Sequence, residues 1–512
     1  MFTSVVNSCI RQKIMSHRLF QRRCNYSSAW ILCGISCLVV SGCAVGPDFV
    51  RPKAPSIDRY NHGQDPTVTV SVDGQSQHFE QGIGPVANWW KLFNSKELDA
   101  AVAEGLANNP SLEAAQASLR QSNDNLQAGY GIFYPQVNAG FGASRQRNSP
   151  ANIGSFAPSG IFNLVTLSAS VSYSLDIFGG KRRAIENLQS QVDLQRSAVL
   201  GTYLALSGNI VNTTIAMAAY QDEIKYTEQL IALQKEQIVI SGKQAQAGTV
   251  PYETVLSLRR QLASLEATLP SLRQRLSQSE HLLATLSGHA PSEWTPSQIS
   301  MSELALPSEL PLSLPSDLVR QRPDILAAEA QLHGASANIG IATAAQFPSF
   351  TLNGAFGQSA TSMGGLFGSN ARFWRLGADI AAPLFNGGTL SAEKQASIDA
   401  YQQSLALYRQ TVLGAFAQVA DTIRALEHDA ETMQAESQSV AASEESLYLT
   451  RINYQAGLIN YLQVLVADIQ FQQAKLVYLQ AQAQRLQDTT ALFVALGGGW
   501  SSASKILDVG AH

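Results

Sequence analysis

Cys43 is the residue of this chain whose surroundings most clearly indicate chemistry. The small residues Ser41 and Gly42 come directly before it, and a short apolar stretch, residues 29–40, comes before them. Upstream of that stretch the chain carries five basic residues and no acidic one: Arg11, Lys13, Arg18, Arg22 and Arg23. A basic region, a short apolar region and small residues before a cleavage point are typical of a secretory signal peptide. We therefore expect residues 1–42 to be removed by cleavage between Gly42 and Cys43, with Met15 as an alternative start.

The small residues in front of Cys43 resemble the bacterial lipobox. This resemblance implies that the thiol receives a diacylglycerol group and that the new amino terminus receives an N-acyl chain such as palmitate. Residue 44 is Ala rather than Asp. By analogy with lipoprotein sorting, Ala44 favours the cell outer membrane over retention in the inner one. An ordinary secretory signal followed by a chance cysteine is the alternative interpretation.

No other pattern in the sequence indicates catalysis or metal binding. All five cysteines lie in the first 43 residues, so the mature chain would keep only Cys43. Cys33 and Cys37 have loose ligand spacing, but they lie in the apolar stretch without a partner His. The eight His residues are scattered, and no Gly-x-Ser-x-Gly motif occurs. We therefore expect no catalytic residue, no metal and no cofactor besides the covalent lipid; an enzyme is the alternative of a different class.

Charge and hydropathy limit the possible partners. The whole chain has a net charge of −4, and loss of the five positive charges in residues 1–43 would leave −9. This balance argues against nucleic acid, which requires a basic face. After residue 43 no apolar run approaches the ~20 residues of a membrane helix. We therefore expect any membrane crossing in the mature chain to be made by strands.

Three sequence landmarks occur twice in the same order. Residues 134–142 (YPQVNAGFG) return as 347–357 (FPSFTLNGAFG), 175–180 (LDIFGG) as 383–388 (PLFNGG), and 246–252 (QAGTVPY) as 455–461 (QAGLINY). The offset is roughly 210 residues each time, far longer than the period of solenoid repeats. The sequence thus predicts an internal tandem duplication of one unit: helix, two strands, long helix, turn and long helix.

Each copy contains two stretches in which apolar and polar residues alternate. The clearest is 163–177, where odd positions from Val165 to Ile177 are apolar or aromatic and even positions are Thr, Ser or Asp. Residues 136–147, 349–360 and 372–385 show related patterns. Strands of about a dozen residues cross a bilayer when tilted, and apolar-out, polar-in alternation is typical of outer-membrane barrels. A sheet with one face on a soluble core is the alternative.

Four strands cannot close a barrel, and open edges in lipid would leave backbone groups unpaired. Two chains would give eight strands, which side chains fill, whereas three would give twelve and leave a lumen. Long proline-free stretches begin at Gly179-Gly180 and Gly387-Gly388 and would extend roughly 90–100 Å as helices. The predicted fold class is a mixed α/β membrane protein: a trimeric outer-membrane β-barrel, four strands per chain and twelve in total, continued by a long periplasmic α-helical barrel.

Four short motifs carry a resemblance to a known family: residues 43–49 (CAVGPDF), 89–90 (WW), 108–112 (NNPSL) and 320–325 (RQRPDI). With the duplication, they resemble the outer-membrane efflux factor family (TolC-like channels), in particular its lipidated branch serving resistance–nodulation–division (RND) pumps. The resemblance implies a homotrimer in outer-membrane lipid, partnered by a periplasmic adaptor (membrane fusion) protein and an inner-membrane RND-type pump. It implies a passive exit duct for drugs or other small molecules. A type I-like protein secretion channel and a non-pore periplasmic lipoprotein are the alternatives.

The resemblance also implies where the tunnel ends. The repeated turns at Gly248 and Gly457 would lie at the periplasmic tip, where glycine suits reversal between long helices. The family usually carries a Leu-Asp-Ala run after the second turn, but here Val466 stands at the expected acid. Asp468 is displaced by two positions, roughly 200° around a helix, so we expect it to form an ion pair and the constriction to be apolar. The candidate periplasmic gate comprises Leu462, Leu465, Val466 and Asp468.

These patterns predict the following organisation along the chain: a lipoprotein signal peptide (1–42), a lipidated extension with an equatorial segment (43–95), a first repeat (96–290), a linker (291–315), a second repeat (316–497) and a C-terminal tail (498–512).

Overall fold

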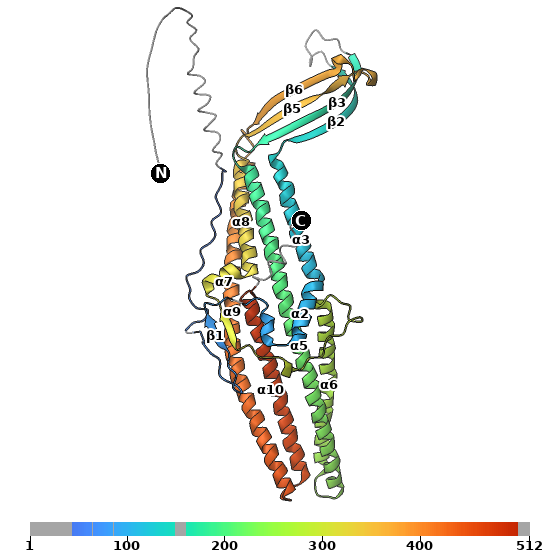
Figure 1. Ribbon diagram of the computed structural model, residues 1–512, viewed down its shortest axis with the longest axis vertical. Coiled ribbons are helices and arrows are strands. Elements are labelled where there is room, and N and C mark those ends of the chain that lie inside the picture. Colours follow the sequence, from blue (N-terminus) through green and yellow to red (C-terminus); the bar gives the residue numbers. More distant parts are fainter. Residues whose placement is uncertain (1–43, 64, 85, 149–159, 500–512) are drawn as a thin grey trace, which may run out of the picture.

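The computed structural model describes residues 44–499 apart from residues 64, 85 and 149–159. The expected cleavage point at Gly42 and Cys43 and residues 500–512 lie outside the described residues. The chain is elongated, with a four-stranded sheet at one end and helices running from it to the far end (Figure 1). A two-stranded sheet lies beside the middle of the helices (Figure 1).

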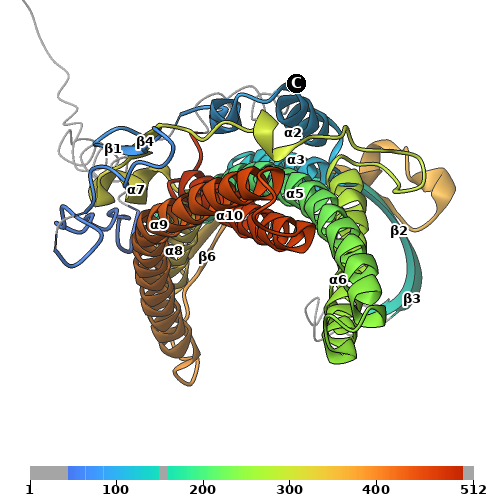
Figure 2. The ribbon, with the colours of Figure 1, turned by 90° about the horizontal axis from the view of Figure 1, so that it is seen from below.

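Two pairs of long helices form most of the length. Helices α5 (Gly180–Gln246) and α9 (Thr389–Gln455) each contain 67 residues. Helices α6 (Tyr252–Leu286) and α10 (Tyr461–Ala495) each contain 35. A 67-residue helix extends about 100 Å, so the expected helix length is confirmed. Seen along the long axis, these helices form a curved layer in the order α9, α10, α5, α6 (Figure 2).

The two halves of the chain repeat one element order. In the first half α3 (Pro110–Tyr130) precedes two strands, α5 and α6; in the second half α8 (Pro323–Ala344) precedes two strands, α9 and α10. Both long helices begin after a glycine in the left-handed region, Gly179 at φ 78° and Gly388 at φ 88°. Glycine adopts that conformation readily because it has no Cβ. The repeated Gly-Gly landmarks therefore mark equivalent strand-to-helix junctions.

The four-stranded sheet is antiparallel in the order β2–β3–β5–β6. Its strands are β2 (Gln136–Asn148), β3 (Gly160–Leu175), β5 (Ser349–Ala360) and β6 (Arg372–Ala381). Each of the four predicted strands is present; β2 is one residue longer than predicted, and the bounds of β3 and β6 differ by more.

The two larger differences have local causes. The strand predicted at 163–177 starts earlier and ends at Leu175, because Asp176 leaves the ladder to cap the next helix. Its Oδ1 accepts from the backbone N of Lys181 at 2.9 Å, and its Oδ2 from that of Arg182 at 3.0 Å. The strand predicted at 372–385 ends at Ala381, since Pro383 has no N–H to continue a ladder.

The N-terminal segment and the linker wrap the outside of the curved layer (Figure 2). Strand β1 (His78–Gln81) pairs in parallel with β4 (Glu309–Leu312), about 230 residues later. The sequence analysis did not predict this sheet. The remaining elements of the described chain are short: α2 (Lys96–Asn108), α7 (Pro315–Gln321), η1 (Trp89–Phe93), η2 (Gly131–Phe133), η3 (Met301–Glu303), η4 (Met363–Gly365) and η5 (Ser369–Ala371).

The largest core lies at mid-length, where the N-terminal segment meets the helices. Trp89 and Phe93 are fully buried, and the ring of Trp89 stacks on that of Phe493 at 5.2 Å between centroids. Burying such aromatic rings contributes several kcal/mol, about 2–3 each. This core fixes the end of α10 against η1.

Among the described helices, none combines the length and hydropathy needed to cross a membrane.

Candidate functional site

The four-stranded sheet presents a continuous apolar face. The cross-strand register aligns Val137, Val171, Gly354 and Leu376 in one row and Ala139, Ala169, Phe356 and Trp374 in the next. Phe356 is 62% exposed, Trp374 72% and Leu376 77%. Contiguous exposure of large apolar side chains marks a surface that contacts lipid or protein. The alternation predicted from the sequence thus places one apolar face on all four strands.

The opposite face is small and polar. The register there aligns Asn138, Ser170, Ala355 and Arg375, and beside them Gln136, Ser172, Asn353 and Gly377. The amide of Asn353 donates to the carboxylate of Asp379 on the neighbouring strand. Hydroxyl and amide side chains make this face suited to contact with water. The sheet can therefore separate an apolar environment from water.

Both edges of the sheet are open. Strand β2 pairs only with β3, and β6 pairs only with β5, within the described part of the chain. An edge strand presents a row of backbone N–H and C=O groups that another strand can pair with. In lipid such groups would have to be paired. In lipid, the two edges of this sheet would therefore need strands from elsewhere.

The first described residues lie at the foot of this sheet. The backbone N of Val45 donates to the carbonyl of Phe178 at 3.0 Å. A Cβ added to Gly179 would lie 2.5 Å from Cα of Ala44, so only glycine permits this close approach. Buried Arg183 then donates to Asp48 at 2.7 Å. These contacts fix Ala44, the neighbour of the predicted lipidated cysteine, where strand β3 passes into α5.

The two predicted turns lie together at the far end of the helices (Figure 1). Gly248 has φ 75° and Gly457 has φ 72°. In both turns the residue after the glycine donates its backbone N–H to the carbonyl five residues earlier: Thr249 to Gln244 and Leu458 to Asn453, each at 2.9 Å. This is the Schellman arrangement, which requires the left-handed conformation that glycine supplies.

The four predicted gate residues on α10 have different environments. Leu465 is only 2% exposed, so it is packed inside the chain rather than presented to a lumen. Its place in an apolar constriction stays a prediction. Val466 is 39% exposed and Leu462 is half-buried. Asp468 is ion-paired: Arg451 of α9 donates from Nη2 to its Oδ2 at 3.1 Å, as expected.

A buried polar clamp ties the N-terminal segment to α10, and the sequence analysis missed it. Arg485 is 1% exposed; its Nε donates to Oε1 of Gln77 and its Nη2 to Oγ1 of Thr69, both at 3.0 Å. Gln77 donates in turn to Thr489 at 3.0 Å. Burial lowers the pKa of Arg485. The neighbours of Arg485 in sequence are themselves polar, Gln484 and Gln487 among them, so nothing local marks it as buried, and its partners lie about 400 residues away in sequence.

A carboxyl pair lies next to this clamp. The pKa of Asp429 on α9 is raised to about 7, first by burial and then by the neighbouring carboxyl of Asp488 on α10. The nearby charges of Arg485 and His428 oppose that rise. One proton shared between the two carboxyls relieves their repulsion. This pair joins the two helices most firmly when it holds a proton.

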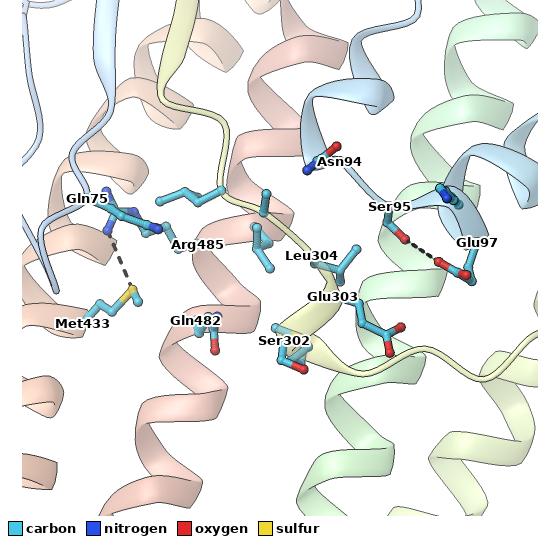
Figure 3. Close-up of a pocket in the computed structure, with 15 residues that line it drawn as sticks. Gln75, Asn94, Ser95, Glu97, Ser302, Glu303, Leu304, Met433, Gln482 and Arg485 are labelled. Atoms are coloured by element: carbon cyan, nitrogen blue, oxygen red, sulfur yellow. Dashed lines mark hydrogen bonds between the residues drawn. The ribbon is translucent and has the colours of Figure 1, made fainter.

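A cavity of about 710 Å³ opens beside the clamp (Figure 3). Its wall combines the N-terminal segment at Gln75, the start of α2 at Ser95 and Glu97, and the linker at Glu303 (Figure 3). Arg485 closes its inner side from α10. Among the described residues no group of three or more His, Cys, Asp or Glu side chains is arranged to hold a metal ion.

The comparison with protein families agrees with this architecture. The family model described as outer membrane efflux protein matches residues 101–289 and 314–498. The two matched segments correspond to the two halves of the chain, and together they cover well over half of it.

Individual relatives are also described as outer membrane proteins of export or efflux systems. The chain is 32% identical over 426 residues to the pyoverdine export outer membrane protein OpmQ of Pseudomonas putida, covering 82% of this chain and 90% of the relative. It is 30% identical over 477 residues to the probable efflux pump outer membrane protein TtgC of the same species, covering 91% and 94%.

A solved structure shares the fold. The outer-membrane channel OprN superimposes with a TM-score of 0.77 at 26% identity, covering 90% of this chain and all of that one. The matched family is one of channels rather than enzymes. The chain belongs to the outer membrane efflux protein family, as an outer-membrane channel component of an efflux system.

Proposed function

We propose that this chain forms a passive exit duct for drugs or other small molecules in a tripartite efflux system driven by an inner-membrane pump. One observation carries the proposal: a sheet with an apolar face, a polar face and two open edges continues directly into helices about 100 Å long. The sheet separates lipid from water, and the helices extend the aqueous path. Relatives described as pyoverdine export and efflux pump outer membrane proteins support the transport role.

The assembly is a homotrimer. Four strands per chain leave edges that only other strands can satisfy, and copies of the same chain supply β6 next to β2. Three copies give a twelve-stranded barrel, wide enough for a water-filled lumen, whereas eight strands would be filled by side chains. The apolar face then contacts outer-membrane lipid and the polar face lines the lumen.

The lipid anchor is on Cys43. The contacts of Val45, Gly179 and Arg183 hold Ala44 at the foot of the sheet, which supports attachment of the lipid to the preceding residue. Diacylglycerol and N-acyl chains on Cys43 reach lipid from that position without unravelling the N-terminal segment. The anchor supplements the barrel, since two sources of membrane affinity act on one chain.

The matched element order and equal helix lengths of the two halves support an internal tandem duplication. We assign the far end of the helices to the periplasmic tip, where a periplasmic adaptor protein docks and connects the duct to an inner-membrane RND-type pump. Leu462 and Val466 form the apolar constriction there, while Leu465 supports it from within the chain. Asp468 holds α10 to α9 through Arg451.

Liposome swelling tests the proposed duct without any pump. Liposomes containing the intact protein should admit small sugars slowly, because the tip is constricted. A variant truncated at both turns, near Gly248 and Gly457, should admit the same sugars rapidly, and the rate should fall as the sugar grows. Equal impermeability of both preparations would favour a non-pore periplasmic lipoprotein.

A further inference from the structure

The curved layer of long helices has two free edges. The helices contact one another in the order α9, α10, α5, α6, so α9 ends the layer on one side and α6 on the other (Figure 2). If three copies share one barrel, α6 of one copy must meet α9 of the next. The side chains that each helix turns away from its own chain should therefore form the seam between copies.

Helix α6 has a distinct outer face near the tip. Val255 and Leu258 are buried toward α5. The opposite face carries Leu256, Arg260, Ala263 and Ala267, which are all exposed. Their spacing of four, three and four residues places them on one stripe of a helix. Leu256 is 50% exposed.

Helix α9 presents a matching stripe. Leu447 is buried in a small cluster with Val464 of α10. The opposite face carries Ala441, Glu445, Tyr448 and Ile452 at the same spacing of four, three and four residues, all exposed. Tyr448 is 63% and Ile452 43% exposed. Glu445 and Tyr448 also border a hollow of about 620 Å³ that lies between α9 and α10, with Asp468 and Phe471 of α10 on its other wall.

The two stripes lie at the same height above the tip. Arg260 is eight residues above the start of α6 at Tyr252, about 12 Å. Tyr448 and Glu445 are seven and ten residues above the end of α9 at Gln455, about 10 and 15 Å. The helices run in opposite directions at this seam, so Leu256 lies level with Ile452. Neither Arg260 nor Glu445 has an ion-pair or hydrogen-bond partner within the described part of the chain.

We propose that Arg260 of one copy binds Glu445 and the ring face of Tyr448 of the next copy, and that this contact seals the tunnel wall near its tip. The partner is thus a second copy of this chain, selected by opposite charge and by complementary apolar residues. A guanidinium pairs with a carboxylate and stacks on an aromatic face in one geometry. The small Ala263 and Ala267 allow close approach of the helices. The inference rests on the proposed trimer.

Disulfide trapping tests the geometry without touching the ion pair. Leu256→Cys combined with Ile452→Cys should give covalent dimers and trimers on a non-reducing gel after mild oxidation. The background is clean, since all native cysteines lie in residues 1–43. Leu256→Cys combined with Ala441→Cys is the control, because these residues would be about 15 Å apart along the seam. Absence of linked chains in the first variant, or equal linking in both, would overturn the proposal.

Charge reversal tests the ion pair itself. Arg260→Glu and Glu445→Arg should each speed dissociation of the detergent-extracted trimer about fivefold or more, and the double variant should return within about twofold of the original rate. Arg273→Glu is the control: Arg273 pairs with Glu228 of its own chain, so Glu445→Arg should not rescue it. If the trimer of the double variant dissociates as fast as that of either single variant, the pairing of Arg260 with Glu445 is contradicted. If the unmodified protein is not a trimer by mass, the proposed function fails instead.

Discussion

Single residues determine how the N-terminal segment is held. Arg485 is a buried cation that binds two neutral oxygen acceptors, those of Gln77 and Thr69. Hydrogen bonds to a charged group contribute about 1.5–3 kcal/mol, and a buried polar group left unpaired is unfavourable by a similar amount. The clamp therefore joins two segments that have no sequence proximity.

We predict that Arg485→Ala lowers the free energy of unfolding by about 3 kcal/mol and accelerates hydrogen exchange across Thr69–Gln77. The reason is that Gln77 and Thr69 lose their shared donor while remaining buried. Arg451→Ala is the control, because its side chain is 55% exposed and it should change stability by less than about 1 kcal/mol. Unchanged exchange at Thr69–Gln77 in Arg485→Ala would show that the clamp does not hold the segment.

Asp429 makes stability depend on pH. Its pKa is raised from 3.8 to about 7 in the folded chain, so between those values the folded state binds a proton that the unfolded state has lost. Its contribution is therefore full below about pH 4 and disappears as the pH rises through about 7. We predict that Asp429→Asn stabilises the protein at pH 8 by about 1–2 kcal/mol, a value reduced for partial solvent exposure.

The measurement for Asp429 is the melting temperature of both proteins from pH 4 to pH 9. The advantage of Asp429→Asn should shrink steadily toward the acid end of that range. Asp468→Asn is the matched control, since Asp468 is paired with Arg451 and should not gain stability at high pH. An advantage independent of pH would mean that Asp429 does not titrate in this way.

For helices and strands, the sequence predicted best those elements that are marked by a local pattern, such as alternation along a strand or a glycine at a junction. Alternation at Val165–Leu175 identified strand β3, and the Gly179-Gly180 landmark identified the start of α5, because both features are local. Pairing of β1 with β4 was not predictable, since each strand has four residues and its partner lies about 230 residues away. Burial of Leu465 was missed for a related reason: one helix face cannot show which neighbours cover it.

The turns provide a prediction for elements. Gly457→Ala should lower the free energy of unfolding by about 1 kcal/mol, because φ of 72° is strained for alanine. The space around Gly457 is open, so conformation rather than collision is the cause. Gly242→Ala, inside α5 with equally open surroundings, should instead stabilise by about 0.5–1 kcal/mol. Thermal unfolding measures the change in the free energy of unfolding for each variant. A change of the same sign in Gly457→Ala and Gly242→Ala would contradict the turn assigned at Gly457.

For the whole molecule, the proposed barrel and the proposed lipid would be two independent attachments to the membrane. We predict that Cys43→Ala loses acylation, seen as a mass decrease, while the protein stays in the detergent-extracted membrane fraction as a trimer. The reason is that the apolar sheet face alone should retain it in lipid. Release of Cys43→Ala as a soluble protein after cell disruption would contradict the barrel.

Three copies of this chain are proposed to enclose a gated aqueous path. Single-channel conductance in a planar bilayer, with the oligomer mass taken on the same detergent-extracted preparation, tests it most directly. We expect a trimer with small, discrete conductance steps that become much larger after truncation at both turns. A monomer without conductance, even after that truncation, would contradict the account and leave the exposed sheet face without lipid to contact.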